Sequence, residues 1–375
     1  MTTSKLAISS ISLGRAAAGH SLRNRLREAR HHGYQGIEIF HEEILHLCST
    51  MTPSSAIPEN QLKAAKQIKS WCDAERLPVA SLQPFMHYEG LLNRDEHRKR
   101  LAELALWLRM AKILDTDMIL IPSTFLKVVL GSEEDVTTGI MAVIVSDLRA
   151  AADTASSMGI RIAYEALCWG THVNTWEQSW EVVRLVDRPN FGLCLDTFNL
   201  GGWFADPAAS SGFIPGWKPQ FEQSMRRLGE TVDVERLFLV QLVDATRMDR
   251  PIARGHELHD ESQPARMSWA RNRRLFYGEH DKGGYLPVKE MCDVIFNELG
   301  YEGWVSFELF HEKLWDRDEG VAEEMAGRGM RAWGKLLRDL EEAKMKVEEP
   351  SSVMACGPAP AFVTTPAHVL ISGNL

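Results

Sequence analysis

Cysteines are few in this sequence, and none of them belongs to a closely spaced pair. The 375 residues contain six, at positions that are far apart: Cys48, Cys72, Cys168, Cys194, Cys292 and Cys356. Scattered cysteines in a long chain are typical of a reduced intracellular protein rather than a disulfide-stabilised secreted one. The start of the chain also lacks the basic and apolar segments of a secretory signal. We therefore expect a cytoplasmic protein.

Long apolar runs and an excess of positive charge are missing as well. No run approaches the ~18 apolar residues that a membrane-spanning helix needs. Lys and Arg total 42 against 51 Asp and Glu, which gives a formal net charge of −9, and no basic stripe is available for nucleic-acid phosphates. Membranes and nucleic acids are thus excluded as expected partners. The hydrophobic content of 45% and the charged content of 25% are ordinary for a globular protein, which excludes disorder of the whole chain.

What the sequence does contain is a regular alternation of strand-like and helix-like segments. Eight short β-rich runs are expected to be strands: Leu6–Leu13, Gly36–Phe40, Val79–Gln83, Met118–Pro122, Ile160–Glu165, Phe191–Asp196, Leu237–Val243 and Trp304–Phe310. Segments with helical periodicity follow them, at about 21–33, 60–76, 94–114, 134–159, 174–187, 220–230, 287–299 and 320–345. The helix at 174–187 is expected to begin with Asn174 and Glu177 at capping-box spacing. Eight β-then-α units predict a parallel sheet that closes into a (β/α)8, or TIM, barrel.

The same pattern predicts one catalytic domain and the position of its active site. Residues 1–347 are expected to form a single barrel whose chemistry lies in loops at the carboxyl ends of the strands. Two of these loops, at about 199–219 and 244–286 after the sixth and seventh strands, have the length of lids or binding loops. Residues 348–375 are rich in Pro, Ala and Ser, and we expect a flexible or loosely docked extension there, to which we assign no function.

Four polar residues stand out near the ends of the last four predicted strands. They are Glu165, Asp196, Gln241 and Glu308. A carboxylate within an apolar strand is costly to bury unless it is paired or bound to a cation, and any one of them alone is better explained by a salt bridge or a loop cap. Together they form an all-oxygen donor set, which favours Mg²⁺, Mn²⁺ or Co²⁺ over a thiolate or imidazole zinc site. No HExxH, GxGxxG or GxxxxGKS/T motif competes with this interpretation.

Several long motifs also carry a family resemblance, in order from about residue 4 to 345: SKLAISSISLGRAAAGHSL, YQGIEIF, LQPFMHYEGL, YEALCWGTHVNTWE, RPNFGLCLDTFNL, VQLVDATRM, PARMSWARNRRLFYGE, YLPVKE and EGWVSFELF. They resemble the fungal 3-dehydroshikimate dehydratases of quinate catabolism, which are xylose-isomerase-like (β/α)8 barrels. The resemblance implies a hydro-lyase that converts 3-dehydroshikimate to protocatechuate and water, with one divalent cation that stabilises an enolate. It also implies that Glu165, Asp196, Gln241 and Glu308 hold this metal, in agreement with the donor set.

Two histidines in predicted loops are candidates for the proton transfer that such a dehydration needs. His172, seven residues beyond Glu165, is the first and His87 is the second, because an imidazole of near-neutral pKa suits proton abstraction. A histidine that only hydrogen-bonds a metal carboxylate or the backbone explains His172 equally well, and a surface-loop histidine is the alternative for His87. Glu38 is a candidate for lining the substrate site, with a buried structural carboxylate as the alternative.

Arginines in the long loop after the seventh strand are candidates for binding the substrate carboxylate. A bidentate guanidinium–carboxylate pair is the physical reason to prefer arginine, and Arg274 and Arg271 are the two candidates. The resemblance favours Arg274, while Arg15 is a weaker option. A basic loop that is merely solvated accounts for at least one of Arg271, Arg273 and Arg274.

The chain departs from the family pattern at three positions, and rival functions stay open. Met86 and Asn199 stand where bacterial relatives often carry Arg and His, and both are shared by the fungal subgroup. Ala270 stands where Ser is commoner, so a hydroxyl contact worth about 0.5–1.5 kcal/mol is missing if that serine touches the substrate. A sugar or keto-acid isomerase or epimerase of the same superfamily, or a non-catalytic metabolite-binding barrel, are the alternatives. The sequence does not choose between a monomer and a homo-oligomer.

Overall fold

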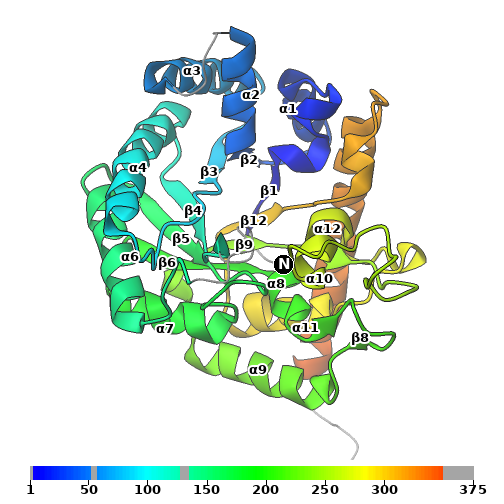
Figure 1. Ribbon diagram of the computed structural model, residues 1–375. Helices are drawn as coiled ribbons and strands as arrows, with labels where there is room; N and C mark the ends of the chain where they lie inside the picture. Colours follow the sequence, from blue (N-terminus) through cyan, green and yellow to red (C-terminus); the bar gives the residue numbers. More distant parts are fainter. Residues whose placement is uncertain (1–2, 52–56, 127–134, 349–375) are drawn as a thin grey trace, which may run out of the picture.

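The chain folds into a closed barrel of eight parallel strands, as Figure 1 shows for the computed structural model, which describes residues 3–51, 57–126 and 135–348. The strands follow one another around the barrel in the order β1-β12-β9-β6-β5-β4-β3-β2. Their bounds are β1 Lys5–Ser9, β2 Gly36–Phe40, β3 Val79–Gln83, β4 Met118–Pro122, β5 Arg161–Glu165, β6 Phe191–Asp196, β9 Leu237–Gln241 and β12 Trp304–Phe307. The predicted (β/α)8 fold is therefore confirmed.

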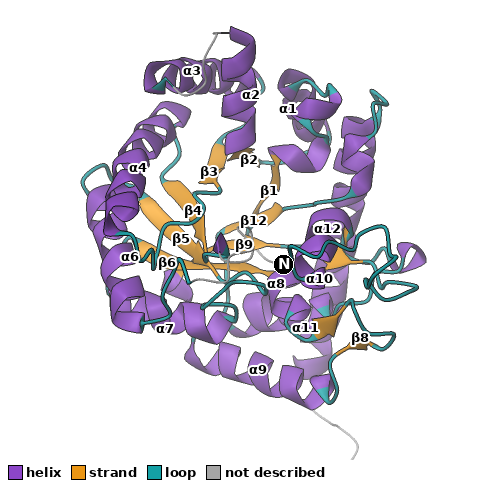
Figure 2. Ribbon diagram, viewed as in Figure 1, coloured by secondary structure: helices purple, strands orange, loops and turns teal. Residues whose placement is uncertain are grey.

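Helices surround the barrel, and Figure 2 shows them outside the ring of strands. Their bounds are α1 Leu22–His31, α2 His41–Met51, α3 Pro58–Ala74, α4 Arg94–Leu114, α6 Met141–Ser156, α7 Trp176–Val186, α8 Thr197–Gly202, α9 Trp217–Thr231, α10 Ala265–Asn272, α11 Val288–Cys292 and α12 Val321–Glu348. A π-helix, Asp293–Glu298, continues α11. Among the described residues, no helix is long and apolar enough to cross a membrane.

The eight predicted strands and the eight predicted helices all have counterparts, but some boundaries and three helices differ. The first predicted strand was too long, because the chain turns into a 3₁₀ helix at Ser10–Leu13. Helices α2, α8 and α10 were not predicted; α10 lies within, and α8 mostly within, the two segments that were read as long loops. The predicted helix at 134–159 begins, in its described part, at Met141, and residue 134 lies outside the described residues, as does the predicted extension beyond Glu348.

The capping box of α7 was predicted one residue too early. Thr175 rather than Asn174 is the N-cap, and its hydroxyl accepts a hydrogen bond from the backbone N–H of Gln178 at 3.3 Å. The Gln178 side-chain oxygen accepts in return from the Thr175 N–H at 3.2 Å. The Asn174 side chain instead donates to the Gly170 carbonyl at 3.2 Å. The Asn174 side chain is thus used in a local hydrogen bond within the preceding loop, and Thr175 caps the helix.

Two-residue alternation sorts the strand residues between two cores. Val305, Phe307 and Leu309 belong to the large cluster between the sheet and the helices, while Trp304 packs with a separate cluster inside the barrel. That inner cluster consists of Met118, Leu120, Ala163, Cys194, Phe238 and Leu239. Because Glu165 and Gln241 alternate in the same register as Ala163 and Leu239, they lie on the lumen side, beyond this apolar layer.

The two long loops carry structure that covers the carboxyl ends of the strands. The loop after β6 contains α8 and a small antiparallel pair, β7 Ala205–Asp206 and β8 Gly212–Phe213. The loop after β9 contains α10 and the pair β10 Asp244–Ala245 and β11 Arg274–Leu275. In the second pair Ala245 lies opposite Arg274, so a residue distant in sequence returns to the end of β9.

Candidate active site

A cavity of about 460 Å³ opens at the carboxyl ends of the barrel strands. Segments that end or follow β1, β2, β3, β4, β5, β9 and β12 line it, which is the position expected for the active site of this fold. The lining residues are Arg15, Phe40, Gln83, Pro84, Met86, Pro122, Phe125, Glu165, Leu167, Trp169, Ala270, Arg271, Asn272, Arg274, Glu308, Phe310 and Trp315. The cavity is therefore lined by apolar side chains with several polar groups between them, as most small-molecule sites are.

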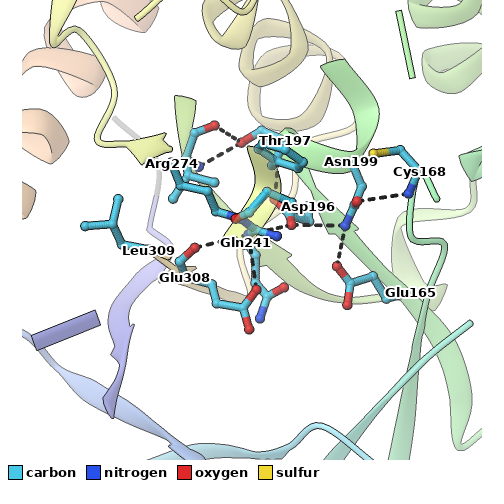
Figure 3. Close-up of polar contacts among 12 residues, drawn as sticks. Glu165, Cys168, Asp196, Thr197, Asn199, Gln241, Arg274, Glu308 and Leu309 are labelled. Carbon is cyan, nitrogen blue, oxygen red and sulfur yellow. Dashed lines mark hydrogen bonds and ion pairs between the residues drawn. The ribbon is translucent and has the colours of Figure 1, made fainter. Parts of the chain in front are cut away.

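Three of the predicted metal-binding carboxylates belong to one hydrogen-bonded chain, which Figure 3 shows. Asn199 Nδ2 donates to Glu165 Oε1 at 2.7 Å and to Asp196 Oδ2 at 3.1 Å. Arg274 Nη1 donates to the same Asp196 oxygen at 2.9 Å and to Glu308 Oε2 at 3.2 Å. An amide and a guanidinium thus connect the carboxyl groups at the ends of β5, β6 and β12.

Gln241 lies opposite Asp196 in the register of β6 and β9, and its side-chain amide donates to Glu38 rather than to the three carboxylates. Its Nε2 donates to Glu38 Oε1 at 3.3 Å, and Ser81 Oγ donates to Glu38 Oε2 at 2.6 Å. Gln241, Glu38 and Ser81 are all fully buried. Burial raises the pKa of Glu38, while hydrogen bonds from Ser306, Ser81 and Gln241 lower it. Glu38 does not line the cavity, so its predicted role in substrate binding stays a prediction.

The three carboxyl groups are buried, and their negative charge exceeds the positive charge beside them. Burial, then repulsion from Asp196 and Glu308, raises the pKa of Glu165 well above its ordinary value. Burial also raises the pKa of Asp196, against the opposing charge of Arg274, and raises the pKa of Glu308 to about 8. A divalent cation among these oxygens would favour their charged forms. The electrostatics and the all-oxygen donors therefore fit a hard divalent cation.

The side chains are not arranged around a single point. Among residues 3–51, 57–126 and 135–348, no three His, Cys, Asp or Glu side chains form a group that could hold a metal ion. Oxygens of these carboxylates already accept hydrogen bonds within the protein: Arg274 donates to Asp196 and Glu308, and Asn199 donates to Glu165. The structure brings the predicted ligands into one region, and the metal site itself stays a prediction.

Neither of the two candidate bases is among the residues that line the cavity. His172 is half-buried, and its Nε2 is 3.0 Å from the Thr137 hydroxyl. The ring of His87 packs against Phe125, a wall residue of the cavity, with centroids 4.5 Å apart. Burial, with the charges of Arg100 and Arg271, lowers the pKa of His87 to about 4, so this imidazole is neutral at physiological pH. Its Nδ1 is buried and has no hydrogen-bond partner among the residues that the structure describes.

The candidate arginines differ in what they contact. Arg274 is 2% exposed and is held by Asp196, Glu308 and the Ala270 carbonyl. Arg271 is exposed at the cavity, where neighbouring protein atoms partly desolvate its guanidinium and lower its pKa.

The weaker candidates have acidic partners of their own. Arg15 pairs with Glu42, and Arg273 pairs with Glu257 and Glu312. Arg15 lines the cavity, whereas Arg273 does not.

Sequence reasoning did not assign roles to two polar residues of this region, Asn199 and Gln83. Asn199 lies in α8, three residues after Asp196, and bridges two carboxylates. Gln83 ends β3, is 1% exposed and lines the cavity, and a hydrogen bond from its side chain to Glu308 opposes the rise in the pKa of that carboxyl group. A polar residue at the end of an apolar strand was the signal available for Gln83.

Comparison with known proteins gives a family match and one relative that is matched over nearly its full length. The family model described as xylose isomerase-like TIM barrel matches residues 26–333. A 3-dehydroshikimate dehydratase of Neurospora crassa is 47% identical over 359 residues, which cover 94% of this chain and 98% of that protein. A 3-dehydroshikimate dehydratase of Pseudomonas putida is 27% identical over 88% of this chain, and the match covers 42% of that longer protein.

Solved structures show the same fold. A xylose isomerase-like TIM barrel/4-hydroxyphenylpyruvate dioxygenase fusion protein superposes with a TM-score of 0.68 at 24% identity, covering 96% of this chain and 47% of that one. The IolI protein, solved with a bound zinc atom, superposes with a TM-score of 0.63 at 18% identity, covering 90% of this chain and 99% of that one. At such identities the superpositions show the fold alone.

Proposed function

This chain belongs to the xylose isomerase-like TIM barrel family, and we propose that it is a metal-dependent 3-dehydroshikimate dehydratase. The observation that carries the proposal is the 47% identity to the Neurospora crassa dehydratase, which extends over 98% of that protein. The match includes the strand ends that form the cavity, where substrate chemistry is expected in this fold. A lyase that acts on a small carboxylated substrate is consistent with the size and lining of the cavity.

The proposed reaction removes water from 3-dehydroshikimate and leaves the aromatic protocatechuate. A proton leaves C6, and the electron pair shifts through the conjugated C1=C2 bond toward the C3 oxygen. The C5 hydroxyl leaves and takes up a proton to form water, and enolisation toward C4 completes the catechol ring. The protein must therefore provide a base for C6, a proton for the leaving hydroxyl and a positive group for the carboxylate.

Glu165, Asp196, Gln241 and Glu308 are the residues that we propose to hold the divalent cation. A hard cation such as Mg²⁺, Mn²⁺ or Co²⁺ would act as a Lewis acid toward the charge that develops on the substrate oxygen. The support is the oxygen donor set and the raised pKa of three buried carboxyl groups. Asn199 orients the Glu165 and Asp196 carboxylates, since its amide donates to both.

His172 and His87 are the two candidates for the base. The support for His87 is its neutral imidazole, its unpartnered Nδ1 and its contact with the cavity wall at Phe125. The support for His172 is its place in the loop that follows the Glu165 strand. Substitution by Gln at each position separates them: loss of the base lowers kcat by roughly 10²- to 10⁴-fold, while loss of the other histidine leaves kcat within a few-fold.

An assay of the chain itself tests the proposed function. The protein is stripped with a chelator, reloaded with Mg²⁺, Mn²⁺ or Co²⁺, and mixed with 3-dehydroshikimate, and the aromatic product is followed by its ultraviolet absorbance. We expect product with a divalent ion and none after chelation. Absence of product with every ion, while a dehydratase of known activity works under the same conditions, contradicts the proposal. Turnover of a neutral ketose instead would favour the isomerase alternative.

Isosteric variants test the metal ligands. Glu165→Gln and Asp196→Asn keep the shape of the side chain and remove its charge, so we expect both to abolish turnover and to weaken cation binding measured by calorimetry. Asp117→Asn is the matched control, because Asp117 is more than half exposed and pairs with Arg161 at 3.0 Å. Near-normal turnover in Glu165→Gln or Asp196→Asn would show that the ligand assignment is wrong.

A further inference from the structure

We propose that Arg271 binds the carboxylate of the substrate and that Arg274 is a positioning residue for the carboxylates at the strand ends. This inference rests on the proposed function and assigns different roles to two arginines of the same loop. Both line the cavity, and they lie three residues apart at the end of α10 and the start of β11. Their surroundings are nevertheless different in charge.

The positive groups that line the cavity are distinguished by their counter-ions. Arg15 pairs with Glu42, and Arg274 pairs with Asp196 at 2.9 Å and with Glu308 at 3.2 Å. Within the described part of the chain, Arg271 makes no ion pair with a carboxylate. Its recorded polar contact is a 3.5 Å hydrogen bond from Nη1 to Gln263 Oε1. An incoming anion would therefore meet an uncompensated positive charge at Arg271.

The geometry around Arg271 also suits a planar anion. The guanidinium lies 5.8 Å from the centroid of the Phe125 ring, another wall of the cavity, and neighbouring atoms partly desolvate it. Desolvation strengthens the attraction of a guanidinium for a carboxylate, and its paired N–H donors match the two carboxylate oxygens. Because Phe125 is apolar, it accepts no hydrogen bond from those donors and leaves them to a ligand.

Arg274 is occupied by groups of the protein itself. Its Nη1 donates to the carboxylates of Asp196 and Glu308 and also to the Glu308 carbonyl at 3.1 Å, and its Nε donates to the Ala270 carbonyl at 3.2 Å. The guanidinium lies over Phe198, at 4.6 Å, and Phe310, at 5.0 Å. Turning Arg274 toward a substrate carboxylate would leave two buried acids without their counter-charge, which is costly.

Binding of two catechols to the metal-loaded protein tests this division. Protocatechuate carries the carboxylate, and catechol is the same ring without it, so the ratio of their affinities by calorimetry isolates the carboxylate contact. We expect Arg271→Met to lower protocatechuate affinity roughly 10- to 100-fold and to leave catechol affinity unchanged, as loss of a charged hydrogen bond predicts. Arg271→Lys should restore part of the difference. Arg254→Met, in the same loop and 88% exposed, is the charge-matched control.

Arg274→Met should weaken both ligands by a similar factor, because it disturbs the strand-end carboxylates rather than the carboxylate contact. Loss of the protocatechuate preference in Arg274→Met, with the preference intact in Arg271→Met, would overturn the inference. Turnover separates this failure from failure of the proposed function. If the wild-type protein dehydrates 3-dehydroshikimate and Arg271→Met has an unchanged KM, the inference about Arg271 is wrong and the proposed function stands. If the wild-type protein has no turnover, the proposed function is wrong.

Discussion

Replacing Arg274 by Met should destabilise the metal-free protein and should make a divalent cation a stronger stabiliser. Arg274 and Asp196 are 2% and 0% exposed at the side chain, and Glu308 is 7% exposed. Removing one partner of a buried ion pair leaves an uncompensated charge, which costs about 3–5 kcal/mol of the free energy of unfolding. Met keeps much of the side-chain volume next to Phe198 and Phe310, so the decrease in the free energy of unfolding comes mainly from the removal of the positive charge.

The pH dependence of this loss has a definite sign. Without Arg274, the pKa values of Asp196 and Glu308, already raised by burial, rise further above those of the unfolded chain. The folded variant therefore binds protons more tightly than the unfolded one, and its free energy of unfolding falls as pH rises. We expect the deficit relative to the wild type to be larger at pH 8 than at pH 5. Denaturant unfolding in the presence of a chelator measures it.

Cation rescue connects the deficit to the proposed metal site. A ligand that binds only the folded state stabilises it by RT ln(1 + [L]/Kd), so a gain in unfolding free energy with Mn²⁺ or Mg²⁺ reports cation binding. We expect a larger gain in Arg274→Met than in the wild type, because the freed oxygens and their uncompensated charge attract the cation.

A second buried ion pair provides the control. Arg25 and Glu43 are each 1% exposed and are joined by a 2.6 Å hydrogen bond from Nη2 to Oε2, and neither lines the cavity. Arg25→Met should therefore lose comparable stability without gaining from the cation. Equal cation gains in the two variants, or an Arg274→Met protein as stable as the wild type in chelator, would refute the reasoning.

Two further predictions concern buried polar groups. Asn199→Ala removes the hydrogen bonds to Glu165 and Asp196 and leaves the Cys168 N–H without its 3.0 Å partner. We therefore expect a loss of about 1–3 kcal/mol in unfolding free energy and weaker cation binding. The control variant Asn190→Ala should lose stability but keep its cation affinity, and equal cation affinity in both variants would contradict the role of Asn199. Burial, with the charge of Asp147 adding to it, raises the pKa of Glu89 to about 7, although the Thr124 N–H and Tyr164 hydroxyl donate to it. Because the folded state keeps a proton that the unfolded state loses, wild-type stability should fall by up to about 3 kcal/mol as pH rises through this range. Denaturant midpoints at pH 5 and pH 8 should show a smaller fall in Glu89→Gln, and an unchanged pH dependence would exclude this account.

The sequence alone was sufficient for the barrel and for the region of the site. Eight alternating segments predicted the closed parallel sheet, because strand and helix periodicities depend on residues that are neighbours along the chain. The four polar residues near the ends of the last four predicted strands also indicated the region of the site, since the chemistry of this fold lies at the carboxyl ends of the strands. Helices α8 and α10 were missed because they are short and lie within segments rich in loop residues.

The tertiary structure decided which polar groups contact one another. Pairing of β10 with β11 returns Arg274 to the strand ends, where it meets Asp196 and Glu308, and no local pattern encodes that pairing. The same fold leaves Arg271 at the cavity with no acidic partner in the described part of the chain, and it places His172 against Thr137. Sequence spacing specifies which residues share a face of a helix or strand. Contacts between loops instead depend on how long segments of chain fold over the barrel, which local spacing does not specify.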